Sequence, residues 1–79
     1  KNKFAIVKEL TAYFKERYET IDVDGIRILF EGGWALIRAS NTQPILVLRF
    51  EAKSEQRMQE IQKIVRDKLL TYPSVTIDF

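Results

Sequence analysis

The stretch GWALIRASNTQPILVLRFEA, residues 33–52, decides the fold, because it holds two apolar runs separated by one short polar segment. The runs at residues 34–37 and 45–48 have the length and aliphatic content of buried strands. The segment between them, residues 38–44, is hereafter the polar loop, and it ends in a proline that cannot donate a hydrogen bond. The stretch therefore predicts two antiparallel strands joined by the polar loop.

The residue types in and after the polar loop suit phosphate binding. Arg38 and Arg49 each offer a rigid, permanently charged fork of donors that matches a phosphate edge. Ser40, Asn41 and Thr42 add hydroxyl, amide and backbone donors within one turn, which is typical of an anion-binding nest. Asparagine also tolerates a left-handed backbone, so we expect that conformation at Asn41. The same composition also suits an ordinary solvated turn, and residue types alone leave both interpretations open.

Upstream of this stretch, residues 2–18 predict an amphipathic helix. Its apolar side chains recur every three or four positions, so we expect one aromatic-rich stripe to be buried: Phe4, Val7, Leu10, Phe14 and Tyr18.

Two glycine-containing pairs predict hairpin turns between this helix and the polar loop. Asp24-Gly25 follows the short apolar run at residues 21–23 and is a strong signal for a tight turn. Residues 26–30 then alternate in the manner of a strand, and Gly32-Gly33 leads into a further strand at residues 34–39.

Downstream, residues 45–52 predict a strand, and Ser54 is a suitable N-cap for a second helix. Tyr72-Pro73 ends that helix, and the alternating tail at residues 75–79 could add an edge strand. The apolar stripe of the second helix consists of Met58, Ile61, Ile64, Val65 and Leu69.

This order of elements predicts an α+β fold, with two helices packed on one face of an antiparallel sheet of about four to five strands. The strands on either side of the polar loop carry apolar residues on both faces, as central strands covered on two sides do. We expect the helices to cover one face and a neighbouring domain to cover the other.

Composition restricts the possible functions. A chain of 79 residues makes one small domain, and it has no cysteine and no histidine, so it lacks disulfides, thiolate metal sites and the commonest general base. Its 13 basic and 11 acidic residues are thoroughly mixed, which is a weak basis for nucleic-acid binding. No apolar run approaches a membrane span and nothing resembles a signal peptide, so we expect a cytoplasmic protein without a membrane partner. The chain begins at Lys1 without a methionine, which fits a domain excised from a longer protein.

Residues 33–52 resemble the C-terminal domain of the α-D-phosphohexomutases, and the order of elements extends the resemblance to nearly the whole chain. The Ser-Asn-Thr form of the polar loop, followed by Leu-Arg-Phe-Glu-Ala, is most similar to the bacterial phosphomannomutase/phosphoglucomutase branch. Many other members carry glycine where Asn41 stands, and both residues suit a left-handed backbone. The resemblance implies a TATA-binding-protein-like fold and a role as the fourth domain of a four-domain enzyme.

The resemblance also implies a reaction. Such enzymes interconvert hexose 1-phosphate and hexose 6-phosphate through a bisphosphorylated sugar, using a phosphoserine of the first domain and a Mg²⁺ held by aspartates of the second. The C-terminal domain grips the phosphate that is not reacting and swings as a lid. By resemblance, Arg38, Ser40, Asn41 and Thr42 would form this grip, with Arg49 in support. The implied partners are mannose or glucose phosphate and the other three domains of the same chain.

No catalytic residue or metal ligand is expected within the 79 residues. Asp22 and Asp24 flank a predicted hairpin turn and are expected to form that turn instead of binding metal. We therefore expect Mg²⁺ to bind outside this domain, and we expect the isolated domain to be inactive.

A module that binds nucleic acid or an acidic partner is the alternative function. Arg27, Arg38 and Arg49 fall on adjacent predicted strands near Trp34, a combination that could stack bases on a sheet. The interspersed acidic residues and the lack of an RNP-like aromatic pattern count against it. A third interpretation is a purely structural interaction domain in which Trp34 and Phe50 are ordinary core residues.

Overall fold

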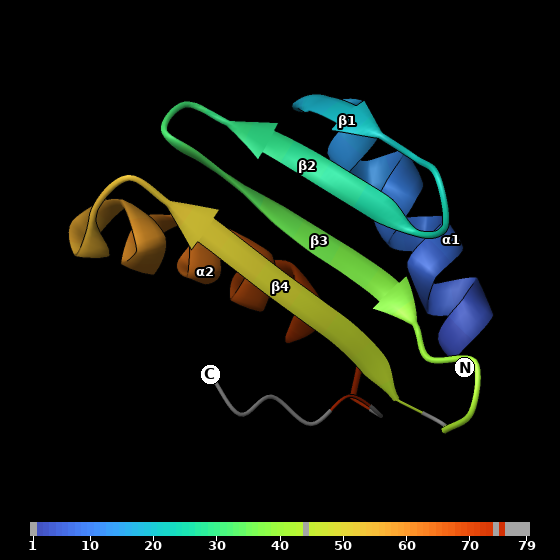
Figure 1. The fold of residues 1–79 in the computed structure, drawn as a ribbon. Helices are drawn as coiled ribbons and strands as arrows, with labels where there is room; N and C mark the ends of the chain where they lie inside the picture. Colours follow the sequence, from blue (N-terminus) through green and yellow to red (C-terminus); the bar gives the residue numbers. More distant parts are fainter. Residues whose placement is uncertain (1, 44, 74, 76–79) are drawn as a thin grey trace.

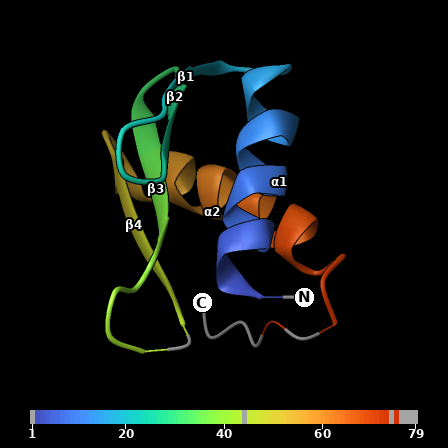
Figure 2. The same ribbon diagram turned by 90° about the vertical axis from the view of Figure 1, so that its right-hand side faces the viewer.

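The computed structural model describes residues 2–43, 45–73 and 75. Its strands form one antiparallel sheet in the order β1-β2-β3-β4 (Figure 1). Both helices lie on the same face of this sheet (Figure 2). The elements are α1 (Lys3–Lys15), β1 (Glu19–Ile21), β2 (Ile26–Phe30), β3 (Gly33–Ala39), β4 (Leu46–Ala52) and α2 (Glu55–Leu69). The predicted α+β architecture is therefore confirmed, with four strands among the described residues.

The predicted tail strand at residues 75–79 lies outside the described residues, apart from Val75. Within the described sheet β3 is a central strand, whereas β4 lies at the edge, so the expectation of two central strands is confirmed for β3 only. No helix in the described part of the chain is long and apolar enough to cross a membrane.

Strand register separates the two faces of the sheet. Ala35 lies opposite Ile28 on one side and Phe50 on the other, and Ile37 lies opposite Ile26. Ala35, Ile37, Ile26 and Ile28 are fully buried beneath the helices. Because side chains alternate along a strand, the residues between them point to the opposite face, which no described element covers and which we call the open face.

The helix α1 is shorter than predicted, and its buried stripe is different. It begins after Asn2, whose side chain accepts a hydrogen bond from the backbone N–H of Ala5. Leu10 and Phe14 are buried as predicted, but Phe4 is 61% exposed and Ile6 takes its place in the core. A helix turns by about 100° per residue, so Phe4 points about 120° away from Leu10. Phe4 thus has the sequence spacing of the predicted stripe, but its side chain points away from the buried face of the helix.

The predicted end of the aromatic stripe, Tyr18, lies beyond α1 and is half-buried. Its ring centroid lies 4.8 Å from that of Phe30 and 6.2 Å from that of Phe14. These ring contacts tie the chain that leaves α1 to the sheet.

The helix α2 follows its prediction closely. The Oγ of Ser54 accepts a hydrogen bond from the backbone N–H of Arg57 at 3.1 Å, which confirms Ser54 as the N-cap. Three members of the predicted stripe are fully buried, and Met58 and Ile64 are half-buried.

Beyond the helix, the Tyr72 hydroxyl donates a hydrogen bond to Glu9 of α1. Burial raises the pKa of the Tyr72 phenol, and its hydrogen bond with Glu9 and the charge of that carboxylate raise it further.

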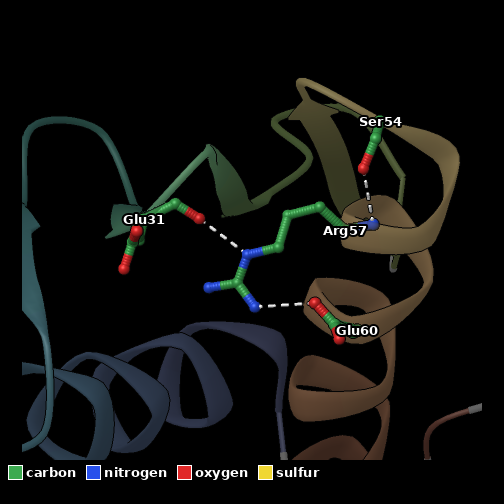
Figure 3. Close-up of polar contacts among 4 residues, drawn as sticks. All are labelled: Glu31, Ser54, Arg57 and Glu60. Atoms are coloured by element: carbon green, nitrogen blue, oxygen red, sulfur yellow. Dashed lines mark hydrogen bonds and ion pairs between the residues drawn. The ribbon is translucent and has the colours of Figure 1, made fainter.

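Arg57 fastens α2 to the turn between β2 and β3 (Figure 3). Its Nε donates to the carbonyl oxygen of Glu31 at 2.6 Å, and its Nη1 lies 3.0 Å from Oε1 of Glu60.

The strand that follows this turn begins at Gly33, where an added Cβ would lie only 2.4 Å from the carbonyl oxygen of Glu51. Glycine is needed at this position because β3 and β4 approach closely there.

We expect Arg57→Met to lower the free energy of unfolding by about 1 kcal/mol, because it removes both hydrogen bonds and keeps most of the side-chain stem. Lys63→Met is the matched control, since it breaks only the exposed pair between Lys63 and Asp67 and should cost less than about 0.5 kcal/mol. Urea unfolding monitored by circular dichroism measures both. Equal losses in the two variants would contradict the fastening role of Arg57.

Candidate functional site

The two predicted site arginines lie on the open face of the sheet. Arg38, near the end of β3, lies opposite Val47, and Arg49 in β4 lies opposite Leu36. This places Arg38 and Arg49 on diagonal positions of adjacent strands, where residues are about 7–8 Å apart and Cβ atoms somewhat closer. Arg49 is exposed and Arg38 half-buried, and neither guanidinium group forms an ion pair or hydrogen bond with another described residue. Two guanidinium groups are thus available beside the polar loop.

The polar loop is closed from within by Ser40. The backbone N–H of Ser40 donates to the carbonyl oxygen of Ile45 at 3.0 Å, which joins the two ends of the loop. Its Oγ accepts from the backbone N–H groups of Thr42 at 3.3 Å and Gln43 at 3.2 Å. The side chain that does this is almost entirely buried, with 9% of the residue exposed. A serine hydroxyl that accepts these bonds still has its own proton to donate.

The expected left-handed backbone at Asn41 is wrong. Among the described residues other than glycine, only Asp24 has a positive φ, at 55°. The turn at residues 40–43 is instead closed by the Ser40 hydroxyl, which supplies the acceptor that the backbone amides need. Asn41 and Thr42 are both exposed, so their side chains are accessible from solvent.

A lysine that sequence reasoning missed also contacts the polar loop. Lys3, in the first turn of α1, donates from Nζ to the carbonyl oxygen of Ser40 at 2.5 Å and to that of Gln43 at 2.7 Å. The residues are 37 and 40 positions apart in the chain. No local pattern in the sequence indicates such a contact, because it depends on how α1 docks against the sheet.

The predicted hairpin turn between β1 and β2 is confirmed, and it lies against Arg38. Gly25 has a φ of 104°, and a Cβ added there would lie 2.5 Å from the carbonyl oxygen of Ile37 and 2.6 Å from Cβ of Arg38. Only glycine allows this approach, which brings the turn beside the strand that carries Arg38.

The carboxylates of this turn do not form a metal site. Asp24 adopts the left-handed turn conformation, as expected for a turn-forming residue, and Asp22 lies 3.5 Å from the ammonium group of Lys15. Across residues 2–43, 45–73 and 75, no group of three or more potential ligand side chains gathers to hold a metal ion. On the described part of the chain, therefore, no cluster of side chains suits Mg²⁺.

The open face also contains the residues of the alternative, nucleic-acid interpretation. Arg27 and Trp34 both lie on it, and the Arg27 guanidinium stacks over the indole at 4.6 Å from its centroid. This stack covers an aromatic surface that a base would need.

The interpretation of Trp34 as an ordinary core residue is wrong, because Trp34 is half-buried outside the helix-side core. Phe50, by contrast, does pack against that core. Side chains alternate along β3, so Trp34 points to the open face because its neighbour Ala35 lies beneath the helices.

Comparison with known proteins identifies the family. A model of the phosphoglucomutase/phosphomannomutase C-terminal domain matches residues 1–68. The chain belongs to this family. A phosphomannomutase/phosphoglucomutase of Pseudomonas aeruginosa is 44% identical over 70 residues, which cover 86% of this chain and 15% of that protein. A phosphoglucomutase of Neisseria meningitidis is 40% identical over 76 residues, covering 94% of this chain and 16% of that protein.

The fold agrees with this assignment. A phosphoglucomutase/phosphomannomutase family protein from Burkholderia thailandensis superposes with a TM-score of 0.84 at 33% identity, over 99% of this chain and 18% of that one. The chain thus spans less than a fifth of the length of the relatives that it matches. The family resemblance inferred from residues 33–52 is confirmed, and so is the predicted α+β fold.

We expect Ser40→Ala to speed amide hydrogen exchange at Thr42 and Gln43, because it removes the oxygen that accepts from both. Thr42→Ala is the matched control, since it removes an exposed hydroxyl from the same turn and should leave exchange at Gln43 unchanged. Nuclear magnetic resonance (NMR) of the labelled chain measures both. Unaltered exchange at Gln43 in Ser40→Ala would show that the hydroxyl does not close the loop.

Proposed function

We propose that this domain binds the non-reacting phosphate of a hexose phosphate, within a phosphomannomutase/phosphoglucomutase that interconverts the 1- and 6-phosphates. The observation that carries the proposal is the position of Arg38 and Arg49, which lie diagonally across β3 and β4 on the open face, with Arg38 at the start of the polar loop. Family membership supports the reaction class, since the matching relatives from Pseudomonas aeruginosa and Neisseria meningitidis are mutases of this kind by name.

The chemistry of the site suits a phosphate dianion. Arg38 and Arg49 keep their charge at any working pH, and each can donate two parallel hydrogen bonds. Ser40 retains a hydroxyl proton, and Asn41 and Thr42 present exposed donors on the same loop. A charge-assisted hydrogen bond contributes about 1.5–3 kcal/mol, so a few of them could anchor the ligand.

A site that recognises only phosphate also suits a mutase. The sugar must bind in two opposite orientations, so that each of its two phosphate positions reacts in turn. Contacts restricted to the distal phosphate remain the same in both orientations. Binding energy from this remote group can also position the sugar for transfer.

The remaining machinery would lie outside these 79 residues. The proposal places the phosphoserine and Mg²⁺ on other domains of the same chain, in a cytoplasmic enzyme. We accordingly expect no turnover of glucose 1-phosphate by the 79-residue chain in a coupled assay, with a full-length mutase as the positive control. Measurable turnover by the chain alone would contradict this assignment.

Titration of the labelled 79-residue chain with glucose 1-phosphate tests the proposed site directly. We expect amide shifts confined to residues 38–42 and the Arg49 side chain, with a dissociation constant on the order of millimolar. Arg38→Gln should weaken binding about tenfold, because a charged donor pair is lost. Arg27→Gln is the matched control, since it removes the same charge from the same face and should change binding less than about twofold.

Two results would contradict the proposed site. The first is a polar loop whose amides do not respond to glucose 1-phosphate at matched ionic strength. The second is equal weakening by Arg38→Gln and Arg27→Gln, which would indicate general attraction to a positive face. Shifts at Arg27 and Trp34 on addition of RNA oligomers, with steep loss in salt, would favour the nucleic-acid module.

A further inference from the structure

Lys3 connects the helix α1 to the polar loop. It belongs to the first turn of α1, a helix whose buried face packs on the sheet through Ile6, Leu10 and Phe14. Its ammonium group nevertheless reaches the polar loop and donates to two carbonyl oxygens there, those of Ser40 and Gln43. The loop is therefore held from the helix side by a charged group on a packed element.

The contact with the Ser40 carbonyl sets the direction of a donor on the opposite side of the loop. In a trans peptide unit the carbonyl and the N–H that follows it point in opposite directions. With the Ser40 carbonyl drawn towards Lys3, the N–H of Asn41 points away from α1. That N–H has no hydrogen-bond partner among the described residues, so it is available to a ligand.

The contact with Gln43 has a different effect. The next residue in the sequence is a proline, so the peptide unit after Gln43 has no N–H to aim. Lys3 instead holds the far end of the turn whose other amides already bond to the Ser40 hydroxyl. The Ser40 hydroxyl closes the turn from within, and Lys3 ties both of its ends to α1.

The two Lys3 contacts also affect the peptide dipoles of the polar loop. Each peptide unit carries a dipole of about 3.5 D, with its negative end at the carbonyl oxygen. Lys3 attracts the negative ends of two such dipoles, which leaves the positive end of the Ser40–Asn41 unit facing outwards. An anion bound outside the loop would meet that N–H together with the guanidinium groups of Arg38 and Arg49.

We propose that Lys3 is a positioning residue of the phosphate site, which presets the polar loop by holding its Ser40 and Gln43 carbonyls and so aims the Asn41 N–H at the ligand. This inference rests on the proposed function. It assigns Lys3 no contact with the phosphate, only with the loop that would bind it.

The test compares Lys3→Met with Lys8→Met in the labelled 79-residue chain. Both substitutions remove one positive charge from α1 and keep a stem of similar length. Unlike Lys3, Lys8 is exposed and forms no hydrogen bond with the described residues of the polar loop. Without ligand, the backbone carbonyl ¹³C shifts of Ser40 and Gln43 should move in Lys3→Met and stay in place in Lys8→Met. With glucose 1-phosphate, Lys3→Met should bind about five- to tenfold more weakly and Lys8→Met less than about twofold.

Lys3→Arg provides the rescue, because a guanidinium can also donate to two carbonyl oxygens, and it should restore affinity to within about threefold of the wild type. Unmoved carbonyl shifts, or equal binding by Lys3→Met and Lys8→Met beside normal wild-type binding, would overturn the role of Lys3 alone. A wild-type chain that does not bind glucose 1-phosphate would overturn the proposed function, and with it any role of Lys3 towards phosphate.

Discussion

The pairing of β3 with both of its neighbours is the constraint on which the rest of the structure depends. β3 aligns with β2 from Gly33 to Ile37 and with β4 along its whole length. A slip of one residue would exchange the two faces and place Arg38 beneath the helices, where an unpaired charge is very costly. The register that buries Ala35 and Ile37 therefore also places Arg38 on the open face.

The sheet consequently separates the buried core from the face that carries the proposed phosphate site. Its helix-facing side holds the buried core, and Arg57 fastens α2 at the end of the molecule formed by the β2–β3 turn. The polar loop lies at the other end of β3, beside the turn that contains Gly25. At that end the Ser40 hydroxyl and the Lys3 ammonium supply the hydrogen bonds that a short loop needs. The side chains of the proposed site can thus be charged and exposed without entering the core.

Local signals in the sequence predicted most elements, because each depends on residues near one another in the chain. Asp24-Gly25 formed its hairpin turn, Ser54 capped its helix, and residues 26–30 formed a strand with the predicted alternation. Not every prediction held, and two residues show why. Phe4 has helical spacing but points away from the sheet, and Asn41 does not need a left-handed backbone because the Ser40 side chain closes the turn.

By itself the sequence determined the fold class, the position of the polar loop and the family, since periodicity, turn residues and the stretch at residues 33–52 are all encoded locally. Only the tertiary structure decided which face the arginines share, that Arg27 covers Trp34, and that Lys3 reaches the loop. These features arise when strands take their register and α1 docks on the sheet. They join residues that are close in space and distant in the chain, and no local pattern specifies such pairs.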